Sequence, residues 1–239
     1  MSIDITAPAP RVFSESDTRT IEMSPSGYLE QILDRELKLT LHGIELGSER
    51  DDSMRQLTDT AATLYDGRIL RELIQNAYDG AGEDVDAHIL VKLDLASAPH
   101  AMLDVCNTGN GFSRADVDSI VNPARSRKQP GNSIGHKGLG FRSVTLISHD
   151  PQIYSSQAEN KAAQFDGFCF RFADEQAQRE RLLHLAEPDL AERAVGKTHS
   201  LQLPLVINSF PDDIQDYVRN CTSLDHLFAS LLTTYLHSI

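Results

Sequence analysis

The chain has 239 residues, of which 40% are hydrophobic and 24% are charged, and its formal net charge is -13. This composition is typical of a globular protein with a sizeable core, and the net charge does not indicate nucleic-acid binding, because attraction to phosphate groups needs a positive potential. No apolar run approaches the roughly 18 residues that span a membrane, and the N-terminus lacks the basic and apolar regions of a secretion signal, which predicts a cytoplasmic protein without a membrane segment.

The first part of the chain is expected to be a poorly ordered lead-in followed by a helix. Residues 1–25 are rich in Pro, Ser and Thr, a composition that does not favour regular structure. A helix is predicted to begin near Ser26 or Gly27 and to carry Leu29, Ile32, Leu33, Leu37 and Leu39. The polar segment 45–54 is expected to form a loop or the start of another helix.

The segment from Leu57 to Ala81 is predicted to hold a helix, a break near Tyr65-Asp66-Gly67 and a second helix. The second helix is expected to bury one apolar stripe, formed by Leu70, Leu73, Ile74, Ala77 and Ala81. Glu72, Asn76 and Asp79 fall on nearly the opposite side and project together. Such a side can hold a metal ion or water, but by itself it is also typical of a solvated helix surface.

An antiparallel hairpin is predicted next. In residues 88–95, apolar side chains alternate with mostly polar ones, which indicates a strand with one buried face. A turn at 97–100 leads to a second strand over 101–106, which runs into Asn107-Thr108-Gly109-Asn110-Gly111, where the glycines allow a tight bend. Ser113 is then expected to cap a short helix over 114–121.

A glycine motif follows a basic loop. Gly135, Gly138 and Gly140 precede a helical pattern near Val144, an arrangement that can turn backbone N–H groups toward an anion. The window from Ser119 to His149 contains no Asp or Glu but holds Arg125, Arg127, Lys128, Lys137 and Arg142. In a chain this acidic, the window indicates either a local anion site or a solvated basic loop.

The remaining chain is predicted to supply further strands and helices. Strands are expected at 152–155 and 168–172, and a charged helical stretch over 175–194 is interrupted at Pro188. Residues 200–207 alternate like a strand, and Pro204 favours the edge of a sheet. Residues 26–210 are taken as the main domain, and residues 211–239 are predicted to be a C-terminal helical segment or the start of a further domain.

The cysteines predict neither a disulfide framework nor a zinc site. Cys106, Cys169 and Cys221 are far apart and lack the spacing of metal ligands. They are therefore expected to be reduced and mostly buried thiols.

Three features occur in order: a helix with Glu and Asn, a strand that ends in an Asn-x-Gly-x-Gly turn, and a cation-rich loop that closes on GxxGxG before a helix. A lone GxxGxG is weak, but the combination resembles the GHKL ATPase superfamily, which includes the ninety-kilodalton heat-shock chaperones, type II topoisomerase ATPase domains, MutL and sensor histidine kinases. Residues Glu72 to Ala77 and Ile134 to Val144 are most similar to the chaperone-like branch that contains sacsin and the plant NO VEIN proteins. The specific likeness covers about Leu64 to Ser148.

The resemblance implies the Bergerat ATP-binding fold, a two-layer α+β sandwich in which helices cover one face of a mixed, mostly antiparallel sheet, with ATP and Mg²⁺ as ligands. Asn76 would coordinate magnesium, and Glu72, one helical turn earlier, would orient or deprotonate the attacking water. Lys137 or Arg142 would add positive charge near the phosphates. The residues that the resemblance places around ATP, besides Asn76, are Asn107, Thr108, Gly109, Gly111, Lys128, Gly135, Lys137, Gly138, Leu139, Gly140 and Phe141.

One position departs from the family pattern. The superfamily usually has Asp at the first position of the turn, where this chain has Asn107. A carboxamide can accept from the exocyclic amine of adenine and donate to the adjacent ring nitrogen, whereas a carboxylate can only accept. The substitution leaves the selectivity for adenine open.

These features support two functional hypotheses beside a structural one. The first is an ATP-dependent conformational switch, with slow hydrolysis through Glu72 and closure of a lid at 122–133. The second is a non-hydrolysing nucleotide-sensing interaction module of a larger defence or nucleic-acid-processing system. In the third, the glycine loops are structural and nothing binds. The switch implies further domains or protein partners, and a homodimer stays open, since dimerisation often accompanies ATP binding in this superfamily.

Overall fold

The computed structural model describes residues 23–48, 56, 68–81, 88–96, 101–121, 143–148, 150–157, 165–198, 201–210 and 230–235. Helices and antiparallel strands make this a mixed protein of the α+β class, as predicted. In chain order the elements are α1 (Pro25–Glu45), α3 (Ile69–Ala81), β1 (Ile89–Asp94), β2 (Met102–Asn107), α4 (Arg114–Val121), a short 3-10 helix (Ser143–Leu146), β3 (Gln152–Ser155), β4 (Phe170–Phe172), α6 (Glu175–Leu185), α7 (Pro188–Thr198), β5 (Pro204–Val206) and β6 (Ser230–Tyr235).

Six strands form one sheet in the order β1-β2-β6-β3-β4-β5, and every ladder between them is antiparallel. This corrects the expectation of a mixed sheet for the described strands. The reason is that β1 pairs with β2, β3 with β4 and β4 with β5, so that consecutive strands reverse direction instead of crossing over. Pro204 opens β5 at one edge of the sheet, as predicted, because an edge tolerates the loss of a backbone donor.

Strand β6 corrects the prediction of a helical segment over residues 211–239. Residues 230–235 lie in the middle of the sheet, where Leu232 stands opposite Val105 of β2 on one side and Ile153 of β3 on the other. The apolar residues between 224 and 232 have helical spacing, but Thr233, Thr234 and the aromatic residue after them favour a strand. The pairing partners supply the deciding contacts, and they lie far away in the sequence.

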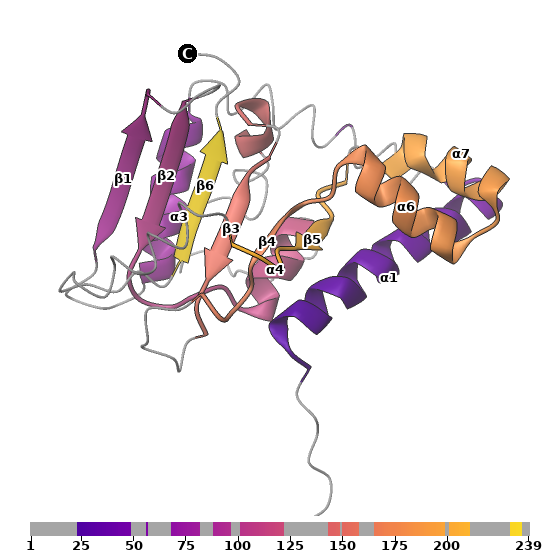
Figure 1. Ribbon diagram of the computed structural model, residues 1–239, viewed down its shortest axis with the longest axis horizontal. Helices are drawn as coiled ribbons and strands as arrows, with labels where there is room; N and C mark the ends of the chain where they lie inside the picture. Colours follow the sequence, from indigo (N-terminus) through magenta and orange to yellow (C-terminus); the bar gives the residue numbers. More distant parts are fainter. Residues whose placement is uncertain are drawn as a thin grey trace, which may run out of the picture.

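Helices cover one face of the sheet. Figure 1 shows α3 and α4 behind the strands, with α1, α6 and α7 grouped beyond the β5 end. Helix α3 packs on β1 and β2, and α1 packs on β5, α6 and α7. The core between these layers includes Leu73, Leu103, Val105, Ile153 and Phe170. None of the described helices is long and apolar enough to cross a membrane.

Helix α1 begins close to the predicted position. Ser24 caps it by accepting a hydrogen bond from Gly27 N at 3.1 Å, and Pro25 fits the first turn because no N–H donor is needed there. Leu39, one of the apolar residues expected on this helix, does not face the core, since it is 40% exposed. Leu41, one helical turn after Leu37, is buried instead. The buried apolar residues of α1 are Leu29, Ile32, Leu33, Leu37 and Leu41.

Helices α6 and α7 are separated at Pro188, as predicted. Asp174 caps α6 by accepting a hydrogen bond from Ala177 N at 2.8 Å. Arg181 of α6 then bridges to α1, because its Nε donates to Asp34 Oδ1 at 2.6 Å and its Nη2 donates to Glu30 Oε2 at 2.9 Å. These contacts hold α6 against α1, which packs on β5.

Strand β1 differs from the prediction of a strand with one buried face. It is an edge strand, and its apolar side chains are exposed on both faces, apart from Ile89, which is partly buried. Alternation in the sequence indicates a strand correctly, but burial also needs a covering layer. Helix α3 leaves the outer part of β1 uncovered.

The other face of the sheet carries a second, smaller core of Cys106, Tyr154, Phe165 and Cys169. Cys106 and Cys169 are buried free thiols, as predicted, and Cys221 lies outside the described residues. Burial raises the pKa of Cys169 to about 11. The neutral thiol therefore stabilises the folded state, and this contribution is lost as the pH rises from the pKa of an unfolded thiol to that of the folded one.

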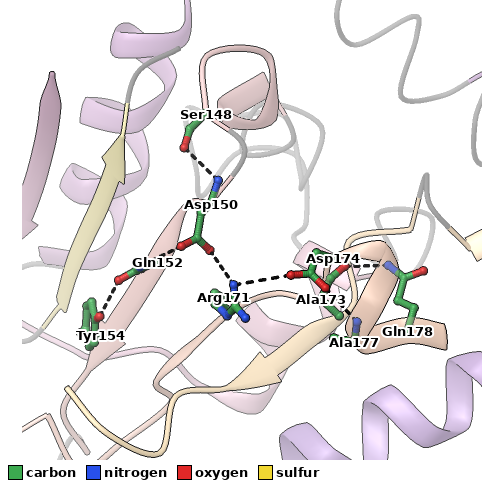
Figure 2. A network of polar contacts seen from close by, with 9 residues as sticks. All are labelled: Ser148, Asp150, Gln152, Tyr154, Arg171, Ala173, Asp174, Ala177 and Gln178. Atoms are coloured by element: carbon green, nitrogen blue, oxygen red, sulfur yellow. Dashed lines mark hydrogen bonds and ion pairs between the residues drawn. The ribbon is translucent and has the colours of Figure 1, made fainter. Parts of the chain in front are cut away.

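A polar network extends this face toward α6. Figure 2 shows Asp150 between Gln152 and Arg171: Gln152 Nε2 donates to Asp150 Oδ2 at 2.8 Å, and Arg171 Nη1 lies 3.5 Å from Asp150 Oδ1. Tyr154 OH donates to Gln152 Oε1 at 2.7 Å, which satisfies the hydroxyl of a buried ring. Arg171 also lies 3.9 Å from Asp174 Oδ2 at the start of α6. The network ties β3 and β4 to α6.

Candidate functional site

Helix α3 carries the residues predicted to act on water and magnesium. It buries Ile69, Leu73 and Ala77, so the buried stripe repeats every fourth residue. The prediction that Leu70 and Ile74 belong to this stripe is wrong, because both side chains are exposed. Residues 69, 70, 73, 74, 77 and 78 form one wide apolar arc, and the sheet covers only part of it.

Glu72, Asn76 and Asp79 are partly buried. At about 100° per residue, Asn76 lies about 60°, Glu72 about 100° and Asp79 about 120° from Leu73, the centre of the buried stripe. They therefore lie to one side of the stripe, whereas the sequence had suggested the opposite side. Gly80 belongs to the same side of the helix, one turn after Asn76 and two turns after Glu72. A carboxylate, a carboxamide and a glycine therefore follow one line along α3, close to the sheet.

The hydrogen-bond pattern shows on which side of β2 each neighbouring strand lies when the sheet is viewed from α3. Thr108 N donates to His88 O, so the backbone groups of even-numbered β2 residues point toward β1. Val105 faces the helix layer, and its backbone groups point the other way, toward β6. For L-amino acids, a viewer on the α3 side who sees β2 run upward has β1 on the left and β6 on the right.

The direction of α3 then decides which side of the helix faces the middle of the sheet. Gly80, near the end of α3, lies against Asn107 at the end of β2, so the helix and the strand run the same way (Figure 1). A right-handed helix in this orientation turns Glu72 and Asn76 toward β6 and turns Leu70 outward past β1. The predicted catalytic side therefore overlies the central strands.

Asn107 ends β2 under the last turn of α3. Its side chain is 5% exposed, and its Nδ2 donates to Thr108 O at 2.9 Å. A Cβ atom added to Gly80 would lie 3.1 Å from Asn107 Nδ2, so glycine in the helix lets the carboxamide approach closely. The structure thus brings Asn107 to the same side of α3 as Asn76 and Glu72.

The turn after Asn107 is tied to both α3 and β1. Asn110 N donates to Gly80 O at 3.1 Å, which satisfies a carbonyl in the last turn of the helix. Thr108 N donates to His88 O at 3.0 Å, and His88 N donates to Thr108 Oγ1 at 2.8 Å. The Thr108 hydroxyl predicted to contact ATP therefore accepts one hydrogen bond within the hairpin, and its oxygen has a second lone pair besides the O–H donor.

Two glycines shape the rest of the turn. Gly109 has a φ of 97°, which a side chain would strain. At Gly111 an added Cβ would overlap the carbonyl oxygen of Ser156 and lie 2.6 Å from Ser155 Oγ. Phe112 N donates to Ser155 Oγ at 2.7 Å. The turn therefore crosses the end of β6 and locks onto the end of β3.

A Ser155→Ala substitution is expected to lower the free energy of unfolding by about 1–3 kcal/mol, because Phe112 N would lose its acceptor in a partly buried setting. Ser155 is fully buried, so water does not replace the hydroxyl. Urea denaturation measures the effect, with Ser26→Ala at an exposed position as the control, expected to stay within about 0.5 kcal/mol of wild type. An unchanged unfolding midpoint for Ser155→Ala would contradict the anchoring role.

Ser113 caps α4 as predicted. Asp116 N lies 3.3 Å from Ser113 Oγ, while Ser113 N and Ser113 Oγ both donate to Asp116 Oδ2, at 2.9 and 2.6 Å. This reciprocal pattern is a capping box with Asp in the third position. It directs the chain from the turn into α4.

The described residues bring together part of the predicted site: Glu72 and Asn76 on α3, and Asn107, Thr108, Gly109 and Gly111 in the turn. Lys128 and the predicted phosphate loop, with Gly135, Lys137, Gly138, Leu139, Gly140 and Phe141, lie outside the described residues, as does Arg142. Among the described residues, no group of three or more His, Cys, Asp and Glu side chains is arranged to hold a metal ion.

Sequence reasoning missed Gly80 and Ser155 as parts of this site. Gly80 accepts from the turn and makes room for Asn107, and Ser155 holds Phe112. A glycine inside a helical pattern, which is unfavourable there without a packing reason, was the available signal for Gly80. Ser155 has no comparable signal, because its role depends on a contact across the sheet.

Comparison of the chain with models of protein families and with curated proteins finds no match. Its function has therefore to be inferred from the residues and their geometry.

Proposed function

We propose that this protein binds ATP with magnesium and hydrolyses it slowly, acting as an ATP-dependent conformational switch of the chaperone-like GHKL type on a Bergerat fold. The observation that carries the proposal is the placement of Asn107 against Gly80, on the same side of α3 as Asn76 and Glu72. Glu72 and Asn76 from one motif and Asn107 from another thus lie on the same side of α3, above the sheet. A turn that matched the glycine pattern by chance would have no reason to lie on this side.

The spacing along α3 suits a nucleotide. Glu72 and Gly80 are eight residues apart, which corresponds to about 12 Å along a helix. The base would lie at the Asn107 end, where the carboxamide oxygen can accept from the exocyclic amine of adenine, and the phosphates at the Glu72 end. Gly109 keeps a side chain away from the base, while Gly111 lets the turn pack closely on β3.

Asn76 fits a magnesium ion held mainly by phosphate. Magnesium usually binds protein through one or two oxygen ligands and keeps phosphate oxygens and water in its coordination shell. The Asn76 carboxamide offers one such oxygen, so a cage of protein carboxylates is not required. When bound, the ion would neutralise charge on the phosphates. Glu72, one turn away, would orient a water and accept its proton.

The test is a calorimetric titration with ATP in the presence of magnesium. Wild type is expected to bind, and Asn76→Ala is expected to bind about tenfold or more weakly, because the ion loses its protein ligand. With EDTA present, the two proteins should bind ATP alike, since no ion remains to distinguish them. Gln75→Ala, which removes a carboxamide from a different side of α3, is the matched control and should behave like wild type.

Absence of ATP binding to wild type would overturn the proposal in favour of glycine loops with a structural role. Binding with no phosphate release, even over many hours, would replace the hydrolysing switch with the nucleotide-sensing module. A weaker affinity of Asn76→Ala that persists unchanged in EDTA would contradict the assigned contact with magnesium.

A further inference from the structure

The outer edge of the sheet carries an apolar surface that the part of the chain described by the structure leaves exposed. Edge strand β1 exposes Leu90 and Val91, and its end exposes Leu93 by 52% and Leu95 by 65%. The outward side of α3 adds Leu70, Ile74 and Tyr78, the last exposed by 59%. The handedness of α3 turns these three residues toward β1, so strand and helix form one continuous surface, called here the β1 edge surface.

We propose that two copies of the chain associate through this surface, with their β1 strands pairing antiparallel about a two-fold axis at Leu93. The two sheets would then continue into one another, and the two α3 helices would lie on the same face of the joined sheet. This association needs no nucleotide and is independent of the proposed ATP site.

The backbone of β1 presents the right groups for this pairing. His88 O accepts from Thr108 N, so even-numbered residues of β1 direct their backbone groups toward β2. The odd-numbered residues therefore direct theirs outward, to the free edge. A two-fold axis at Leu93 pairs Leu93 with its copy, and each Leu93 offers its outward N–H and C=O groups to the other. Leu95 would stand opposite Val91 of the second chain but lies in a bend after β1, where Ala96 N donates to Asp94 Oδ1 at 2.9 Å, so the regular pairing covers residues 92–94 of each chain.

The charges of β1 select this register. With the axis at Leu93, Lys92 stands opposite Asp94 of the second chain, and the same pair repeats on the other side of the axis. These are positions without cross-strand backbone bonds, where side chains approach most closely. An axis at Lys92 or Asp94 would oppose like charges and would meet inward-pointing backbone groups. An axis at Val91 or Leu95 would leave both charges without an opposite partner.

The helix layer is compatible with the joined sheet. Each α3 covers β1 and β2 of its own chain, so the two helices would be two to three strand spacings apart, or about 10–14 Å. Helices in direct contact are about 8–10 Å apart, and exposed Leu70, Ile74 and Tyr78 are long enough to fill the difference. Figure 1 shows α1, α6 and α7 at the opposite end of the sheet, where they do not obstruct the β1 edge.

A second copy also accounts for the composition of the edge. Natural edge strands usually carry charges, proline or a bulge that discourages pairing. The charges of β1, Lys92 and Asp94, have opposite signs and face each other in this register, and β1 with the residue after it also exposes four apolar side chains. When two copies pair in this register, the outer edge of β1 is covered in both chains. The assembly is closed, because the other edge of each sheet begins with Pro204.

The first test is sedimentation of the full chain over a range of concentrations. Wild type is expected to form a dimer with a dissociation constant on the order of micromolar, because a strand edge with one flanking helix is a small interface. Lys92→Glu alone and Asp94→Lys alone should each weaken association about 100-fold, since each would bring like charges together twice. A mixture of the two variants should regain association, because the introduced glutamate then faces the introduced lysine, while Asp94 of the first variant faces Lys92 of the second.

Recovery on mixing separates the proposed register from a loss of folding, which mixing does not repair. Wild type that stays monomeric at several hundred micromolar, or variants that fail to associate on mixing while wild type dimerises, would overturn the proposal.

The second test is oxidation of single cysteine variants. Leu93→Cys is expected to form a disulfide across the axis, where the paired Cα atoms would be about 5.5 Å apart. Leu90→Cys is the matched control, exposed on the same strand, but its copy would be about 20 Å away in this register. Equal crosslinking of both variants, or none above wild type for Leu93→Cys, would show that the copies do not meet at Leu93.

Discussion

A Glu72→Gln protein is expected to bind ATP and magnesium like wild type but to release phosphate about 100-fold or more slowly. Glutamine keeps the size and hydrogen-bonding reach of glutamate, so the helix and the neighbouring Asn76 stay in place. What it lacks is the capacity to take a proton from water. Because Glu72 is partly buried on the side of α3 that faces β6, solvent is not expected to substitute for this base.

Single-turnover phosphate release, measured beside calorimetric binding, separates the two effects. Glu45→Gln at the end of α1 makes the same chemical change on an exposed helix far from α3 and should leave both quantities unchanged. If Glu72→Gln binds ATP and hydrolyses it at the wild-type rate, Glu72 is not the catalytic residue. If Glu72→Gln no longer binds ATP, the Glu72 carboxylate contributes to binding of ATP itself, and the roles assigned to the residues along α3 have to change.

A Gly111→Ala protein is expected to lose at least about 3 kcal/mol of folding stability. The added methyl group would overlap the backbone carbonyl of Ser156 and press on Ser155 Oγ. A backbone atom cannot move aside as the end of a flexible side chain can. The hydrogen bond from Phe112 N to Ser155 Oγ would be displaced with it, so the turn would separate from β3.

Chemical denaturation with Gly196→Ala as the control tests this expectation. Gly196 lies within α7, where an added Cβ meets nothing within 4 Å, and alanine favours a helix over glycine by up to about 1 kcal/mol. The two identical substitutions should therefore act in opposite directions. A Gly111→Ala protein as stable as wild type would mean that the turn does not pack on β3 as described.

Local patterns predicted most of the elements, and they failed where burial depends on distant partners. The apolar arc of α3 was recognised, but its sequence does not say which part faces the sheet, and the stripe centred on Leu73 is buried while Leu70 is exposed. Strand β1 alternates as a half-buried strand does, yet it lies at an edge. In both cases the missing information was the position of the neighbouring layer.

Motif order groups Glu72, Asn76 and Asn107 as candidate site residues, and their roles in binding and hydrolysis stay predictions. The structure places the three residues on one side of α3. Gly80 and Ser155, which hold that arrangement, were not identified, because each acts through a single contact with a residue remote in sequence. A sequence motif contains the residues that a ligand would contact, whereas the residues that hold the motif in place depend on the fold.

The position of β6 has a consequence for how the chain folds. The hairpin β1–β2 and the meander β3–β4–β5 share no ladder with each other, and both are joined only by residues 230–235 among the described strands. Until residues 230–235 insert, β2 and β3 would each have an unpaired edge. The turn from Asn107 to Phe112 would then not have β3 at the distance at which it packs. Closing loops of this length is slow, so we expect the packing of the Asn107 to Phe112 turn on β3 to be among the last folding events of the protein.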